Sequence, residues 1–195
     1  MINSSTQGAQ LPLAFRPVGG ELYAHVFESS RAGVPRNLFW NMYVKFKPVA
    51  IDGDEWDCAL LVDWLTWPIP TWRDLEGMDL SKIVLPAMVE PSLYFMGEHN
   101  DAALHDLRLD GRQGTVLQVA VAASVQVTTE KERLSIPIAF TCPLQFMGII
   151  IASDSIGPEP LTPAGATEAV AKFIGTDGLR PARSEGRRYV LDAEG

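Results

Sequence analysis

A repeat of apolar side chains at every second position restricts the fold of this chain more than any other feature. The repeat runs through residues 38–46 and 115–140. Successive side chains of a β-strand point to opposite sides, so a period of two is typical of strands that bury one face. One face of the first segment is wholly apolar and consists of Leu38, Trp40, Met42, Val44 and Phe46. The pattern predicts sheet layers around a shared apolar interior.

Short turn signals join the predicted strands. Asp-Gly pairs at 52–53 and 110–111 are typical of tight hairpins. Amphipathic helices, which parallel strand–helix–strand units would need, do not appear between the strands. We therefore predict a mainly β fold, in which an antiparallel meander forms a sandwich or a partly open barrel with one short C-terminal helix. An α+β fold is the alternative.

The predicted helix lies near the C-terminus. Thr162 is its N-cap, Pro163 its first residue and Gly175 its terminator, so it runs to about residue 174. A single helical turn is also predicted after Thr71, because Asp74 occupies the capping-box position.

Composition divides the chain into three parts. We predict a flexible tail (1–10), a single mainly β domain (11–175) and a polar C-terminal extension (176–195). A domain of this size buries enough surface to fold without a metal or a disulfide framework. Cys58 and Cys142 lie in apolar runs, which favours buried, reduced thiols.

Charge and hydropathy limit the classes of partner. The net charge of −8 repels phosphate backbones, so we expect no nucleic-acid partner. Apolar runs stay shorter than a membrane span, and the first residues lack the basic and apolar regions of a secretory signal. We therefore expect no membrane association and a cytoplasmic location.

Catalytic motifs are absent from the sequence. It contains no G-x-S-x-G elbow, no nucleophilic cysteine in a histidine context and no glycine-rich phosphate loop. His99 and His105 lie near carboxylates, but their spacing matches no compact metal site. We therefore predict no catalytic residue, no metal site and no cofactor, although carboxylate pairs that meet only in space leave enzymatic activity open.

Five residues are the predicted ligand- or partner-binding residues. Four tryptophans lie close together in the sequence, and densely spaced tryptophans line pockets or form protein-binding hot spots, although a core cluster at one end of the sheet is the favoured explanation. Between them an aspartate lies in an apolar strand, where desolvation would raise its pKa, although a side chain that faces solvent or pairs with an arginine is the favoured alternative. The five are Trp56, Asp63, Trp64, Trp67 and Trp72.

Two functions remain open. The first is a non-catalytic protein-binding domain with an acidic surface, for example an inhibitor or immunity-type partner of a basic protein. A predicted edge strand at 134–141 is a further place where a partner could bind. The second is a β-barrel or sandwich that binds a small apolar ligand, with or without enzymatic activity. Homo-oligomer formation is compatible with both.

Overall fold

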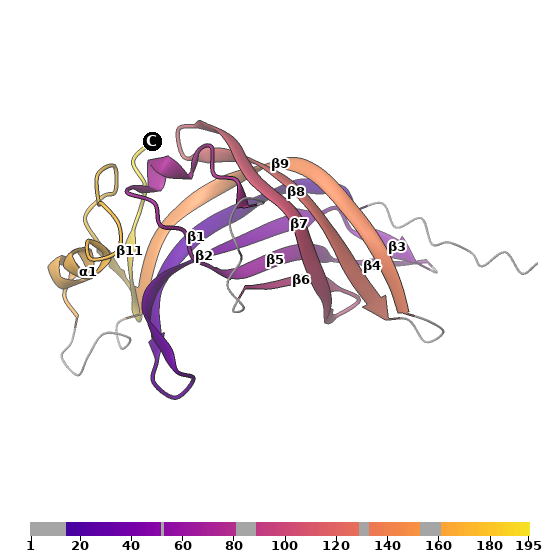
Figure 1. The fold of residues 1–195 in the computed structure, drawn as a ribbon, viewed down its shortest axis with the longest axis horizontal. Coiled ribbons are helices and arrows are strands. Elements are labelled where there is room, and N and C mark those ends of the chain that lie inside the picture. Colours follow the sequence, from indigo (N-terminus) through magenta and orange to yellow (C-terminus); the bar gives the residue numbers. More distant parts are fainter. Residues whose placement is uncertain (1–14, 52, 81–88, 129–132, 153–160) are drawn as a thin grey trace, which may run out of the picture.

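The computed structural model describes residues 15–51, 53–80, 89–128, 133–152 and 161–195, so the predicted tail (1–10) lies outside it. Seven strands form a closed barrel (Figure 1). They are β1 (Pro17–Ser29), β2 (Val34–Phe46), β5 (Cys58–Leu65), β6 (Glu90–Phe95), β7 (Glu98–Gln113), β8 (Val116–Thr128) and β9 (Arg133–Ala152). The prediction of a mainly β fold is confirmed.

The barrel is an antiparallel meander closed by one parallel seam. Each strand pairs antiparallel with the next along the order β1-β2-β5-β6-β7-β8-β9. The last strand then returns to the first, and β9 pairs in parallel with β1 from Gly20↔Leu144 to Val26↔Ile151. Pro137 lies in β9 before that seam begins. In this stretch the described pairing of β9 is with β8.

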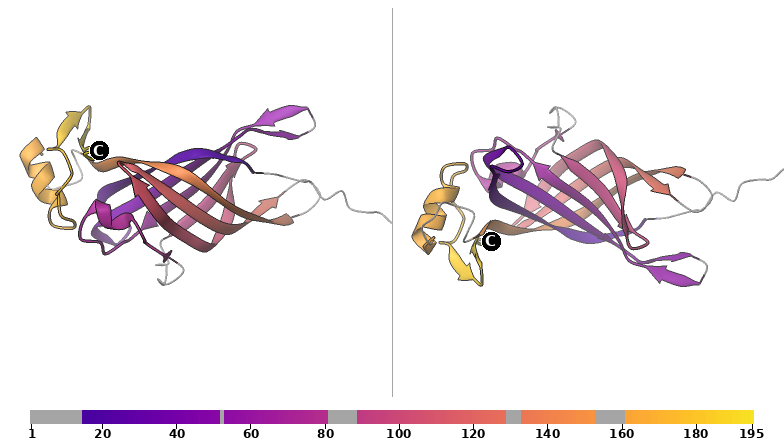
Figure 2. Two further views of the ribbon diagram at one scale, coloured as in Figure 1. Left: turned by 90° about the horizontal axis from the view of Figure 1, so that it is seen from above. Right: turned by 90° about the horizontal axis from the view of Figure 1, so that it is seen from below.

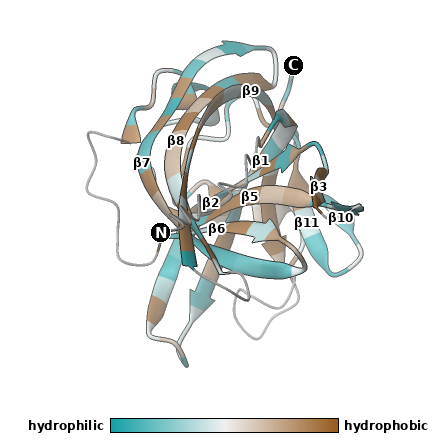
Figure 3. Cartoon of the chain, turned by 90° about the vertical axis from the view of Figure 1, so that its right-hand side faces the viewer, coloured by the Kyte–Doolittle hydropathy of each residue, from teal (hydrophilic) through white to brown (hydrophobic). Residues whose placement is uncertain are grey.

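Apolar side chains line the interior of the barrel. Every residue of the apolar face predicted for 38–46 is buried, and Trp40 and Val44 are 0% exposed. The other strands contribute their own alternate residues to the same cluster, including Leu60, Leu93 and Val119. Figure 3 shows the strands arranged as a ring around this interior. Both cysteines are buried, unpaired thiols, as predicted.

The chain after β5 folds back over the barrel core. Its short 3-10 helix η1 (Trp72–Leu75) begins at Thr71, whose backbone N–H and hydroxyl both donate to the Asp74 carboxylate, at 2.8 and 2.7 Å. Trp72 is 0% exposed and stacks on Phe146 of β9, with ring centroids 5.0 Å apart. Its indole N–H donates to the carbonyl oxygen of Gly178, which joins this segment to the C-terminal residues.

The C-terminal residues form a small unit at one end of the barrel (Figure 2). It holds helix α1 (Pro163–Val170) and strands β10 (Arg183–Glu185) and β11 (Arg188–Leu191). Helix α1 is capped by Thr162 as predicted but ends earlier, and only turns continue to residue 174. Strand β11 pairs with the end of β9, so the polar extension includes part of the sheet.

Gly148 marks the place where β9 changes partner. Its φ of 101° is a conformation that favours glycine, and a Cβ atom there would collide with the Leu191 carbonyl group of β11.

At the other end of the barrel, β3 (Val49–Ile51) and β4 (Asp54–Trp56) form a separate two-stranded hairpin (Figure 2). No described helix is long and apolar enough to cross a membrane.

Candidate functional site

A β-bulge between β2 and β5 places two consecutive side chains on the outside of the barrel. Trp40 pairs with Leu65 and Met42 with Val62, so Asn41 alone faces both Asp63 and Trp64. Val62 and Leu65 are both 0% exposed in the core. The two residues between them therefore belong to the outer face, and the bulge is what allows both to lie there.

Trp64 adopts the left-handed conformation that this bulge requires. Its φ is 66°, and only one other described non-glycine residue, Met96, has a positive φ. A bulky side chain in this region costs about 1–2 kcal/mol relative to ordinary strand geometry. Such strain persists only where the surrounding contacts maintain it, and it is common at functional sites.

Asn41 supplies those contacts from beneath the bulge. It is 4% exposed, and its side-chain oxygen lies 3.4 Å from the backbone N–H of Trp64, which can only donate. The amide nitrogen therefore faces His25 and donates to Nδ1 at 2.7 Å. This arrangement requires an unprotonated Nδ1, so His25 is a neutral ring with its proton on Nε2. Burial lowers the pKa of His25, which favours the same neutral form.

Three rings, those of His25, Phe27 and Phe39, pack around Trp64; we call these four rings the outer aromatic cluster. Trp64 meets Phe27 and Phe39 at centroid separations of 5.2 Å and His25 at 5.5 Å, all edge to face. Each such contact contributes about 0.5–1.5 kcal/mol beyond burial. Phe39 is 1% exposed although it lies on the outer face, so these rings form a small apolar cluster separate from the barrel core.

Three carboxylates border this cluster; we call Glu21, Asp63 and Glu90 the acidic rim. Asp63 pairs with Glu90 across the β5–β6 ladder. Burial raises the pKa of Asp63, the charge of Glu90 raises it further, and His99 lowers it. The pKa of Tyr23 is also raised, by burial and then by the charges of Asp63 and Glu21. The rim therefore has a negative potential that the neighbouring aromatic face shares.

The structure separates the five sequence-predicted site residues. Asp63 and Trp64 lie together on the outer face. Trp67 and Trp72 are buried against the barrel core, where the ring centroids of Trp67 and Trp40 lie 5.5 Å apart. Trp56 ends β4 and packs, partly buried, against the same core.

Sequence reasoning missed the two residues that hold the outer aromatic cluster in place. Neither His25 nor Asn41 was singled out from the sequence. An available signal was Phe39, an aromatic residue on a face that otherwise carries polar side chains and lysines.

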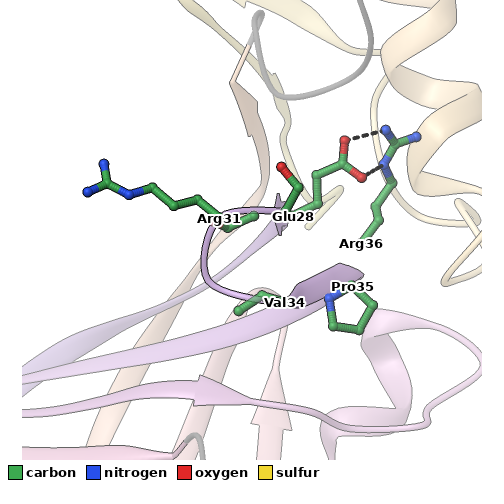
Figure 4. Close-up of a pocket in the computed structure, with 8 residues that line it drawn as sticks. Glu28, Arg31, Val34, Pro35 and Arg36 are labelled. Carbon is green, nitrogen blue, oxygen red and sulfur yellow. Dashed lines mark hydrogen bonds and ion pairs between the residues drawn. The ribbon is translucent and has the colours of Figure 1, made fainter.

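A hollow of about 640 Å³ lies at the turn between β1 and β2 (Figure 4). Glu28 and Arg36 face one another across it and form two hydrogen bonds, of 2.6 and 3.0 Å. Arg31 points away from this pair. Because the facing charges neutralise each other and the lining comes from a single turn, the hollow is a weaker candidate than the outer aromatic cluster.

The histidines near carboxylates have other partners. His99 Nδ1 lies 3.1 Å from the Ser92 hydroxyl, and His105 Nε2 lies 3.0 Å from that of Ser124. Within the described ranges, no group of three or more histidine, cysteine, aspartate or glutamate side chains is placed to hold a metal ion.

Comparison with protein-family models, with curated proteins and with solved structures finds no match to this chain.

Proposed function

We propose that the chain is a non-catalytic protein-binding domain and that the outer aromatic cluster with its acidic rim is the contact surface. The observation that carries this proposal is the strained Trp64, supported from below by the buried Asn41. Tryptophan and tyrosine dominate the binding energy of protein interfaces, and a rigid aromatic side chain loses little entropy on binding. Tyr43 and Tyr94, exposed by 38% and 37%, extend the aromatic character of the same sheet.

Charge favours a basic partner. The net charge of −8 and the acidic rim attract a positively charged surface and accelerate its approach. An inhibitor or immunity-type role against a basic protein in the cytoplasm fits these properties.

Affinity capture from a lysate of the source organism tests the proposal. The wild type is compared with Trp64→Gly, which removes the ring and keeps a residue suited to the positive φ. Met147→Ala is the matched control, because this exposed apolar side chain lies on β9. We expect a protein retained by the wild type and by Met147→Ala, with about tenfold less recovered by Trp64→Gly. Equal recovery by all three proteins would contradict the proposal.

A second function is favoured by a different observation. The indole N–H groups of Trp40 and Trp67 are buried in the barrel core and have no hydrogen-bond partner in the described chain. Buried donors normally find an acceptor, so a small, mainly apolar ligand with one acceptor atom would suit this interior. Native mass spectrometry of protein purified from its own host tests this idea. A bound small molecule would support it, and a spectrum of the bare chain alone would count against it.

A further inference from the structure

We infer that the acidic rim and the outer aromatic cluster recognise a guanidinium group, presented by an arginine of the basic partner. The inference rests on the proposed protein-binding function and specifies which chemical group of the partner is bound. Charge complementarity, the partly exposed Trp64 and the contacts of this chain's own arginines favour this occupant.

Glu21, Asp63 and Glu90 form no ion pair within the described ranges, and His99 is the neighbour that lowers the pKa of Asp63. Elsewhere the chain pairs several carboxylates with its own arginines. Such pairs are Glu28–Arg36, Asp106–Arg108, Glu76–Arg112, Glu185–Arg188 and Asp192–Arg183. The outer face is therefore a place where negative charge remains available to a second molecule.

Position makes this charge useful for recognition. Asp63 and Trp64 are adjacent in one bulge, and Glu90 is the cross-strand neighbour of Asp63. A cation bound by these carboxylates would therefore lie close to Trp64, which is partly exposed. Burial keeps the Asp63 carboxylate partly dehydrated, and a dehydrated carboxylate gains more from an opposite charge than a fully hydrated one.

A guanidinium suits this combination better than an ammonium. It is planar, stacks on aromatic faces and donates two parallel hydrogen bonds to a carboxylate. The chain already contains such contacts between its own side chains. The guanidinium carbons of Arg73 and Arg112 lie 5.5 and 5.3 Å from the centre of the Trp72 ring. Arg112 also lies 3.7 Å from a Glu76 oxygen, so one arginine here contacts both a tryptophan and a carboxylate.

Titration with defined small probes tests the inference. The ¹⁵N-labelled full chain is titrated with N-acetyl-arginine amide and, separately, with N-acetyl-lysine amide, at constant ionic strength. The indole N–H resonances are the readout, and Trp64→Gly assigns the signal of Trp64. We expect a saturable shift of that signal with the arginine probe and about tenfold weaker binding of the lysine probe.

Charge-neutral variants locate the site. The double variant Asp63→Asn/Glu90→Gln is expected to weaken binding of the arginine probe about tenfold or more. Glu168→Gln is the matched control, because it removes an equivalent exposed carboxylate from α1, and it is expected to bind the probe like the wild type. A circular dichroism spectrum confirms that each variant is folded.

The outcomes separate this inference from the proposed function. Absence of a saturable shift, equal binding of both probes, or unchanged binding by the double variant overturns guanidinium recognition. If the double variant nevertheless captures the partner protein normally while Trp64→Gly does not, the protein-binding function stands without guanidinium recognition. If Trp64→Gly also captures the partner normally, the proposed function fails by itself.

Discussion

Asn41 is the one buried polar residue in the described chain, and replacing it with alanine tests the structural basis of the outer face. In Asn41→Ala the backbone N–H of Trp64 loses its acceptor, and His25 loses the donor to Nδ1. An unsatisfied buried group costs about 1–3 kcal/mol, and a lost hydrogen bond about 0.5–1.5 kcal/mol. The bond to Trp64 is long and His25 is partly exposed, so both values fall near their lower ends. We expect a loss of about 1.5 kcal/mol in the free energy of unfolding.

Urea denaturation measures this loss. Unfolding is followed by tryptophan fluorescence at about pH 8, where His25 is neutral. Gln118→Ala is the control, because this exposed residue of β8 lies in the same kind of sheet and should change stability by less than about 0.5 kcal/mol. If Asn41→Ala is as stable as this control, Asn41 does not support the bulge and the reasoning about Trp64 is wrong.

Three further predictions concern pH, backbone geometry and thiol reactivity. Since the pKa of His25 is lowered in the fold, its contribution to stability is present above about pH 6.5 and is lost on acidification. Asn41→Asp places a carboxylate oxygen at Nδ1 and raises that pKa, so denaturation at several pH values should show a smaller loss of stability in acid than in the wild type. Gly148→Ala should lower the free energy of unfolding by about 2 kcal/mol or more in urea titrations, whereas Gly111→Ala, where a Cβ meets open space, should not approach that loss. Burial raises the pKa of the Cys58 thiol to about 12, so mass spectrometry should find both cysteines unmodified by iodoacetamide in the native protein and alkylated in denaturant.

Local pattern predicted local structure well. Alternation in residues 38–46 identified which side chains face the interior, because the pleat of a strand fixes side-chain direction without further information. The single turn after Thr71 and the start of α1 at Thr162 were also predictable, since capping depends on residues three positions apart. The raised pKa of Asp63 followed from one carboxylate in an apolar strand.

Features set by distant pairings could not be predicted. The parallel seam joins segments at opposite ends of the barrel sequence, and no local pattern specifies which edge a strand will find. The bulge at Trp64 was hidden because glycine, rather than tryptophan, is the usual signal of a positive φ. Because the bulge was not foreseen, proximity in sequence suggested one tryptophan cluster. The structure instead places Trp64 on one side of the sheet and Trp67 on the other.

The parallel seam also determines the order in which this molecule can be completed. Strand β1 leaves the ribosome before the other barrel strands, yet its partner on one side, β9, is the last of them to be made. Until then the growing chain is an open, curved sheet with unsatisfied backbone groups at β1 and at its newest strand, and such edges invite pairing with other chains. Contacts between distant residues form slowly. Shortened chains that end before β9 should therefore aggregate rather than form a smaller barrel.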